Sequence, residues 1–162
     1  MSNTQAMCTS FLGELMTATH NFTTGTGNTF KAALFLATSN TSSSTTLCAS
    51  VTAYATTVNT IAEVSGTNYV AGGVTITNGT SPASTNSSTT AGVGYWTPTA
   101  SFTYTNVTLT TAFDAVLIYN SSASNKAVSV HTFGSQTVTA GTFTLTMPSN
   151  TTSTALIRLA TT

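Results

Sequence analysis

The chain has few side chains that could carry out acid–base chemistry. Its 162 residues include three acids, three bases and two histidines. Paired carboxylates in an acid–base site normally have several ionisable neighbours, and Glu14, Glu63 and Asp114 have almost none. We therefore interpret each acid as a structural residue at a turn or a sheet edge. For Asp114 we expect an ion pair with Lys126 or Arg158.

The sequence also lacks the usual motifs for metal binding and for an activated nucleophile. His20 and His131 lie in separate segments, which favours two hydrogen-bonded histidines over a shared metal site. Cys8 and Cys48 are the only cysteines, and without a CxxC or Cys/His cluster a zinc site is not expected. Their spacing leaves open whether they form a disulfide, although two thiols in a reducing compartment are favoured. We predict no catalytic, cofactor-binding or metal-binding residues, and no enzymatic activity.

Charge is scarce over the whole chain. Charged residues make up 4% of the sequence, against about a quarter in a typical soluble domain. Three cations are too few to follow the phosphates of a nucleic acid, so we expect no nucleic-acid partner. The net charge of +0 leaves little repulsion between copies, which favours a subunit of a larger assembly.

The sequence does not predict a membrane protein or an exported one. No apolar run approaches the ~20 residues that a membrane-spanning helix needs. The segment Met1–Met16 lacks both a basic start and an uninterrupted apolar stretch, so it does not resemble a secretory signal.

Alternation of apolar residues with threonine dominates the pattern. In Thr103–Thr110, Thr142–Met147 and Val74–Thr77, every second residue is apolar and most of the others are threonine. This two-residue period is typical of half-buried β-strands, in which threonine keeps the outer face hydrated. Further strands are expected at Phe30–Ala37, Thr52–Val58, Asn68–Ala71, Phe113–Tyr119, Ala127–Phe133 and Ala155–Leu159.

Turn residues separate these strands. Gly72–Gly73 indicates a bend, Asn120–Asn125 a hairpin loop, and Ala140–Gly141 either a tight hairpin or a kink. The alternation slips at Asn106–Val107, which predicts a β-bulge. Phe113–Tyr119 is apolar on both faces and is predicted to be a central strand.

The pattern predicts one all-β domain over residues 1–162, an antiparallel β-sandwich and possibly a jelly roll, with about eight or nine short strands. The only helical segment expected is a short one at Ser10–Thr17. Long exposed loops are expected near 39–46 and 78–94, where Ser, Thr, Gly and Asn dominate. We expect six strand residues to be mostly buried in one core, namely Leu117, Tyr119, Val128, Val130, Phe143 and Leu145.

Two binding functions fit parts of this pattern. Threonine ladders on a flat sheet can bind ice, but the Thr-x-Thr pairs here lack the fixed period of a solenoid. A receptor- or glycan-binding module could use exposed aromatic rings for stacking, and the candidates are Tyr54, Tyr69, Tyr95 and Trp96. Such rings serve more often as core or interface anchors, and Trp96, close to Pro98, could cap the sandwich.

Several blocks of the chain resemble a family of small tailed-bacteriophage virion proteins. The matching blocks are Thr19–Phe35, Glu63–Gly73, Phe113–Ser122, Ala127–Gly134, Gly141–Pro148 and Ala155–Ala160. They follow one another in order over most of the chain. The chain departs from the resemblance in the Ser/Thr-rich segments Ser39–Cys48 and Thr80–Gly92.

The resemblance implies a virion structural protein, assembled in the host cytoplasm, whose partners are the major capsid protein or other virion subunits. Within that class we expect a capsid decoration (cement) protein that stabilises the head, because such a subunit needs no catalysis. We expect it to form a homotrimer. The alternative in the same particle is a tail, adaptor or fibre-associated subunit. The resemblance does not separate head from tail.

Overall fold

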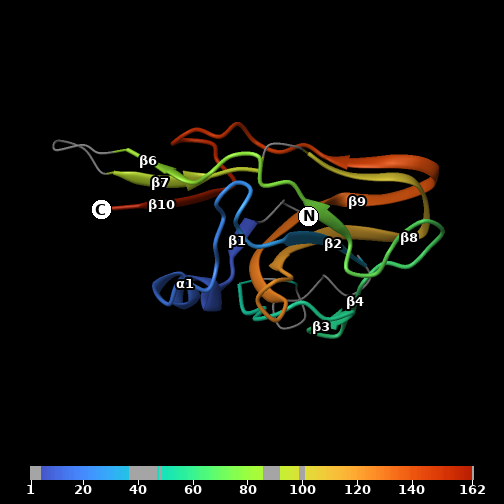
Figure 1. The fold of residues 1–162 in the computed structure, drawn as a ribbon. Coiled ribbons are helices and arrows are strands. Elements are labelled where there is room, and N and C mark those ends of the chain that lie inside the picture. The colour runs from blue at the N-terminus through green and yellow to red at the C-terminus, as the bar shows by residue number, and fades with distance from the viewer. Residues whose placement is uncertain (1–4, 37–46, 48, 86–91, 99–100, 162) are drawn as a thin grey trace.

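The fold is all-β and antiparallel, with a sandwich-like arrangement of sheets and one short helix, as the sequence predicts (Figure 1). The computed structural model describes residues 5–36, 47, 49–85, 92–98 and 101–161. The loop expected near 39–46 therefore lies outside the described residues. Of the loop expected near 78–94, the described part contains β6 (Ala83–Ser84) and the start of β7 (Val93–Trp96), so it is not loop throughout.

A five-stranded sheet with the order β1-β9-β8-β2-β5 forms the centre of the molecule. Its strands are β1 (Gln5–Met7), β2 (Phe30–Leu36), β5 (Val74–Ile76), β8 (Phe102–Asn120) and β9 (Lys126–Leu145). All neighbouring strands in it are antiparallel. The strand predicted to be central, Phe113–Tyr119, is the inner half of β8 and lies between β9 and β2, which confirms that prediction.

Two strands are much longer than the sequence analysis expects. The segments Thr103–Thr110 and Phe113–Tyr119 join into β8, which has 19 residues, and β9 runs through 20 residues without a break. Bulges take the place of the expected turns, because the register between β8 and β9 shifts between Tyr104 and Val107 and again further along. Asn106 has a φ of 52°, which confirms the predicted bulge. Ala140, with a φ of 46°, makes a kink within β9 rather than a hairpin.

A smaller sheet stands out from the body as an arm. It has the order β10-β7-β6, where β10 is Ile157–Ala160, and it carries the C-terminal end of the chain at its tip (Figure 1). A two-stranded ribbon of β3 (Thr57–Val58) and β4 (Ile61–Ala62) completes the described sheets.

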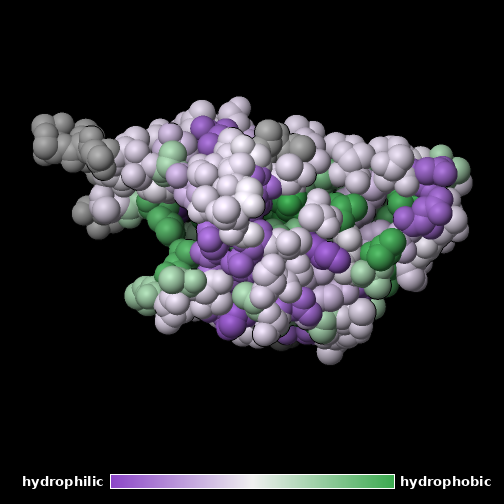
Figure 2. Space-filling view, viewed as in Figure 1, coloured by the Kyte–Doolittle hydropathy of each residue, from purple (hydrophilic) through white to green (hydrophobic). Residues whose placement is uncertain are grey.

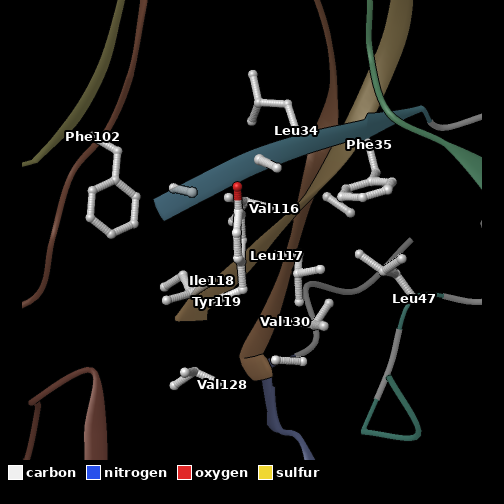
Figure 3. Close-up of a cluster of buried hydrophobic side chains, with 14 of the residues drawn as sticks. Leu34, Phe35, Leu47, Phe102, Val116, Leu117, Ile118, Tyr119, Val128 and Val130 are labelled. Atoms are coloured by element: carbon white, nitrogen blue, oxygen red, sulfur yellow. The ribbon is translucent and has the colours of Figure 1, made fainter. Parts of the chain in front are cut away.

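The core lies along the inner halves of β2, β8 and β9. Figure 3 shows part of this core, with Leu34 and Phe35 of β2 beside side chains of β8 and β9. Leu117, Tyr119, Val128 and Val130 are buried, as predicted. The prediction overstates the burial of Phe143 and Leu145, which are only partly buried and pack against the margin of the core. The reason is that the outer half of β9 has one face in solvent.

The helix α1 (Thr9–Met16) falls where the sequence predicts one. Phe11 is buried and Leu15, one turn later, packs against the core, so this face of the helix lies on the sheet. Leu12 and Met16 point outward and are 42% and 85% exposed.

Two predicted strands are wrong. Residues 68–71 form a turn rather than a strand, because Asn68 has a φ of 60° and the chain then bends at Gly72 and Gly73, where φ is also positive. Thr52–Val58 contains only an isolated bridge at Ala53 and the two residues of β3. Isolated backbone hydrogen bonds take the place of a sheet ladder, such as Tyr54 N–H to the Asn125 carbonyl oxygen and Tyr69 N–H to the Gly66 carbonyl oxygen.

Candidate functional site

The eight candidate ionisable residues do not meet in one place. His20 lies in the loop after α1, and His131 lies in β9 with its Nε2 3.0 Å from Ser129 Oγ. No group of three or more His, Cys, Asp or Glu residues that could hold a metal ion occurs among the described residues. Cys8 is buried, and Cys48 lies outside the described residues.

Glu14 is the centre of one polar cluster. Lys126 Nζ donates to Glu14 Oε1 at 2.6 Å, and His20 Nε2 donates to Glu14 Oε2 at 2.7 Å. Burial alone would raise the pKa of Glu14, but the hydrogen bonds and charges of Lys126 and His20 outweigh it and lower the pKa. Lys126, one of two cations expected beside Asp114, thus forms its ion pair with Glu14. Asp114 is buried in β8, and Arg158 is exposed on β10.

The same cluster fixes the tautomer of His20. With Nε2 donating to Glu14, the other ring nitrogen accepts from Asn120 Nδ2 at 3.1 Å. Asn120 Nδ2 also donates to Asn28 Oδ1 at 2.9 Å. Helix α1, the loop 20–29 and the hairpin between β8 and β9 are therefore tied together, which is a structural role.

A second cluster surrounds Glu63, and the sequence analysis did not predict it. Its carboxylate accepts from Tyr54 Oη and Tyr69 Oη at 2.7 Å each, and from the Gly72 backbone N–H at 2.8 Å. Burial, and then the hydrogen bond to Glu63, raises the pKa of both tyrosines well above the usual range. No feature of the sequence near Glu63 points to this network. It fastens the turn 65–73 onto the sheet, since Tyr69 Oη also accepts from the Leu34 backbone N–H of β2 at 3.0 Å.

The four aromatic residues considered for glycan stacking do not form a common platform. Tyr54 stacks on Tyr119 with ring centroids 4.4 Å apart, and Tyr69 lies against Tyr104 at 5.9 Å. Trp96 is 2% exposed and donates from Nε1 to the Thr80 carbonyl oxygen at 2.9 Å. These rings anchor the packing of the fold.

The threonine-rich face lacks a continuous ladder as well. Thr103 and Thr144 are directly paired on the outer part of the β8–β9 ribbon, and both are exposed. Beyond this pair the bulges shift the register several times, so threonine hydroxyls do not repeat at one spacing.

An apolar groove separates the arm from α1. Its volume is about 480 Å³, and its walls are Phe11 and Leu15 of α1, Phe22 of the following loop, and Trp96, Ile157 and Leu159 of the arm. Figure 2 shows hydrophobic side chains lining the notch between the arm and the helix. Of the four exposed large hydrophobic residues in the described part of the chain, Leu159 lines this groove, whereas Leu12 and Met16 lie on α1 outside its lining.

A second cavity of about 430 Å³ lies between the β8–β9 ribbon and the segment 146–156. Phe102, Ile118 and Met147 line it together with His131. Burial lowers the pKa of His131 to about 4, so this ring is neutral at neutral pH.

Comparisons with protein-family models, with curated proteins and with solved structures find no match for this chain. Within the described residues, no helix has the length and apolar character needed to cross a membrane.

Proposed function

We propose that this protein is a bacteriophage virion structural protein that decorates the outside of the capsid and stabilises the head. The observation that carries the proposal furthest is the arm, a three-stranded sheet beside an apolar groove on a chain with almost no charge. Its outer strands β10 and β6 pair only with β7 among the described residues. Such a surface suits attachment to other protein subunits through backbone and apolar contacts.

The resemblance of the six sequence blocks to small virion proteins is the second support. A decoration subunit needs no catalysis, and it gains strength from repetition, since modest contacts multiplied over symmetry-related copies give high avidity. The protein would act as a homo-oligomer whose partner is the major capsid protein. A neutral surface rich in hydroxyls makes these contacts without the desolvation cost of burying ions.

The test is the position and copy number of the protein in purified virions of the phage that encodes it. We expect hundreds of copies per particle on the shell, counted by quantitative mass spectrometry and located by cryo-EM. A few copies on the tail axis would replace this proposal with a tail, adaptor or fibre-associated role. Absence from the particle would overturn a virion role altogether.

Attachment should also depend weakly on salt, because only six charged side chains can be screened. We expect the protein to stay on intact particles when salt is raised to about 1 M. Quantitative release under that condition would show that charge on the capsid drives attachment, against the apolar contact proposed.

A further inference from the structure

The outer edge of β10 is open in the described part of the structure. Strand β10 pairs with β7 alone, through the regular register Ile157↔Trp96 to Ala160↔Val93. With four residues it is longer than the other edge strands of the two larger sheets, which have two or three. It lacks the bulges, prolines and lysines that usually protect an edge from pairing.

The hydrogen bonds between β10 and β7 show which backbone groups of β10 point toward the open edge. Thr161 N–H donates to the Gly92 carbonyl oxygen at 2.9 Å, so Thr161 faces β7. In an antiparallel pair this direction alternates, so Leu159 also faces β7, whereas the N–H and C=O groups of Arg158 and Ala160 point to the open edge. The edge thus offers two residues with both donor and acceptor available for another strand.

We propose that β10 is a self-association edge, which pairs antiparallel with β10 of a second copy about a two-fold axis at Leu159. In this register Arg158 lies opposite Ala160 of the second copy, and the two residues exchange hydrogen bonds on each side of the axis. Four backbone hydrogen bonds form in all, because each of the two pairs contributes two. The three-stranded arms join into one continuous sheet of six strands.

Two copies of β10 fit together better with the axis at Leu159 than with the axis shifted by one residue. An axis at Arg158 would place two guanidinium groups opposite each other, which is destabilising. An axis at Leu159 separates them and brings the two leucine side chains together in a pair without hydrogen bonds, where side chains lie closest. Leu159 is 41% exposed at the rim of the apolar groove, so this contact buries apolar surface on both copies.

Charge also favours a second copy as the occupant of this edge. The chain has a net charge of +0, and Arg158 is the only charged residue in the arm strands β6, β7 and β10. Whole copies therefore repel one another little, and the register at Leu159 keeps the one like-charged pair, Arg158 and its counterpart, diagonal rather than directly opposed. The inference does not depend on the proposed virion function, and it replaces the trimer expected from the sequence with a two-fold pair for the isolated protein.

Cysteine cross-linking tests the register directly. Directly opposed residues in a pair without hydrogen bonds have Cα atoms about 4.5 Å apart, within the range of a disulfide. We expect Leu159→Cys to form a covalent dimer under mild oxidation. The matched variant Arg158→Cys should not form a covalent dimer. Its counterpart in the second copy lies diagonally across the pair, at about 7–8 Å or more, which is too far for a disulfide. The unmodified chain controls for Cys8 and Cys48.

Sedimentation equilibrium on the full chain measures the association itself. We expect a weak dimer whose dissociation constant rises at least tenfold in Leu159→Lys, because two ammonium groups would meet at the axis. Val70→Lys is the matched control, since Val70 is also exposed, at 73%, but lies outside the arm. Circular dichroism checks that both variants fold. A monomer at all concentrations, a trimer, or equal cross-linking of both cysteine variants would overturn the proposal.

Discussion

Lys126 donates a hydrogen bond from Nζ to Glu14 Oε1 at 2.6 Å, although the two residues are 112 positions apart in the chain. This contact ties α1 to the start of β9, beside the hairpin loop that follows β8. The same carboxylate holds His20, so one acid positions both the helix and the loop that form one side of the apolar groove.

Removal of the charge on Glu14 should loosen the helix. We expect Glu14→Gln to lower the free energy of unfolding by about 1 kcal/mol at pH 7, a modest value because the Lys126 side chain is 39% exposed. The lowered pKa of Glu14 means that its contribution is present above the ordinary carboxyl range and is lost as the pH falls through the folded-state pKa. Denaturant titrations at pH 7 and pH 3 should show the two proteins converging in acid. A constant difference between them would contradict this role.

Substitutions in the Glu63 network should lower the free energy of unfolding more than Glu14→Gln does. Three donors point at one buried carboxylate, so Glu63→Gln places an amide N–H₂ group against a donor and should cost about 2–3 kcal/mol. Tyr69→Phe removes one donor and should cost less, about 1–2 kcal/mol. Equilibrium urea unfolding measures both. A neutral effect of Glu63→Gln would contradict the three-donor arrangement around this carboxylate.

His131 should make stability depend on pH. Its pKa falls from 6.5 in the unfolded chain to about 4 in the fold, so between these values only the unfolded state binds the proton. The free energy of unfolding should therefore decrease as the pH drops from about 6.5 to about 4, by up to about 2–3 kcal/mol. His131→Gln should lose less stability over the same interval. Parallel pH profiles for the two proteins would contradict the burial of a neutral ring.

Gly73 should not tolerate a side chain. It has a φ of 71°, and a Cβ atom there would overlap the backbone carbonyl of Ala32 in β2. We expect Gly73→Ala to cost at least about 3 kcal/mol, since the backbone itself must move. Gly25 provides the control, because its φ is 78° but nothing lies within 4 Å of its Cβ position. Gly25→Ala should cost only about 1 kcal/mol, and thermal unfolding separates the two.

Truncation of Phe113 and of Phe143 should cost different amounts of stability, although the two rings are in contact. The centroids lie 4.9 Å apart in an edge-on arrangement, but Phe113 is fully buried and Phe143 is at the margin. We expect Phe113→Ala to cost about 3–5 kcal/mol and Phe143→Ala about half as much. Equal costs would show that Phe143 is buried more deeply than the structure places it.

The class of fold could be predicted from the sequence, and so could the local features that depend on neighbouring residues. The two-residue alternation predicted strand structure in the outer parts of β8 and β9, the apolar run predicted the central strand, and the slip at Asn106 predicted the bulge in the outer half of β8. Each of these depends on side-chain chemistry within a few positions, which a sequence displays directly. The short helix was predicted for the same reason.

The contacts between residues far apart in the chain could not be predicted and became known from the folded structure. Nothing near Glu63 in the sequence indicates that Tyr54 and Tyr69 donate to its carboxylate, and nothing near Lys126 indicates Glu14. The folded structure also shows that bulges, not turns, interrupt the apolar alternation in β8 and β9. It shows as well that residues 68–71 form a turn. Long-range pairing depends on how the sheet brings segments together, and one sequence carries no record of that arrangement. The open edge of β10 is likewise a property of the assembled sheet, since a strand is at an edge only relative to its neighbours.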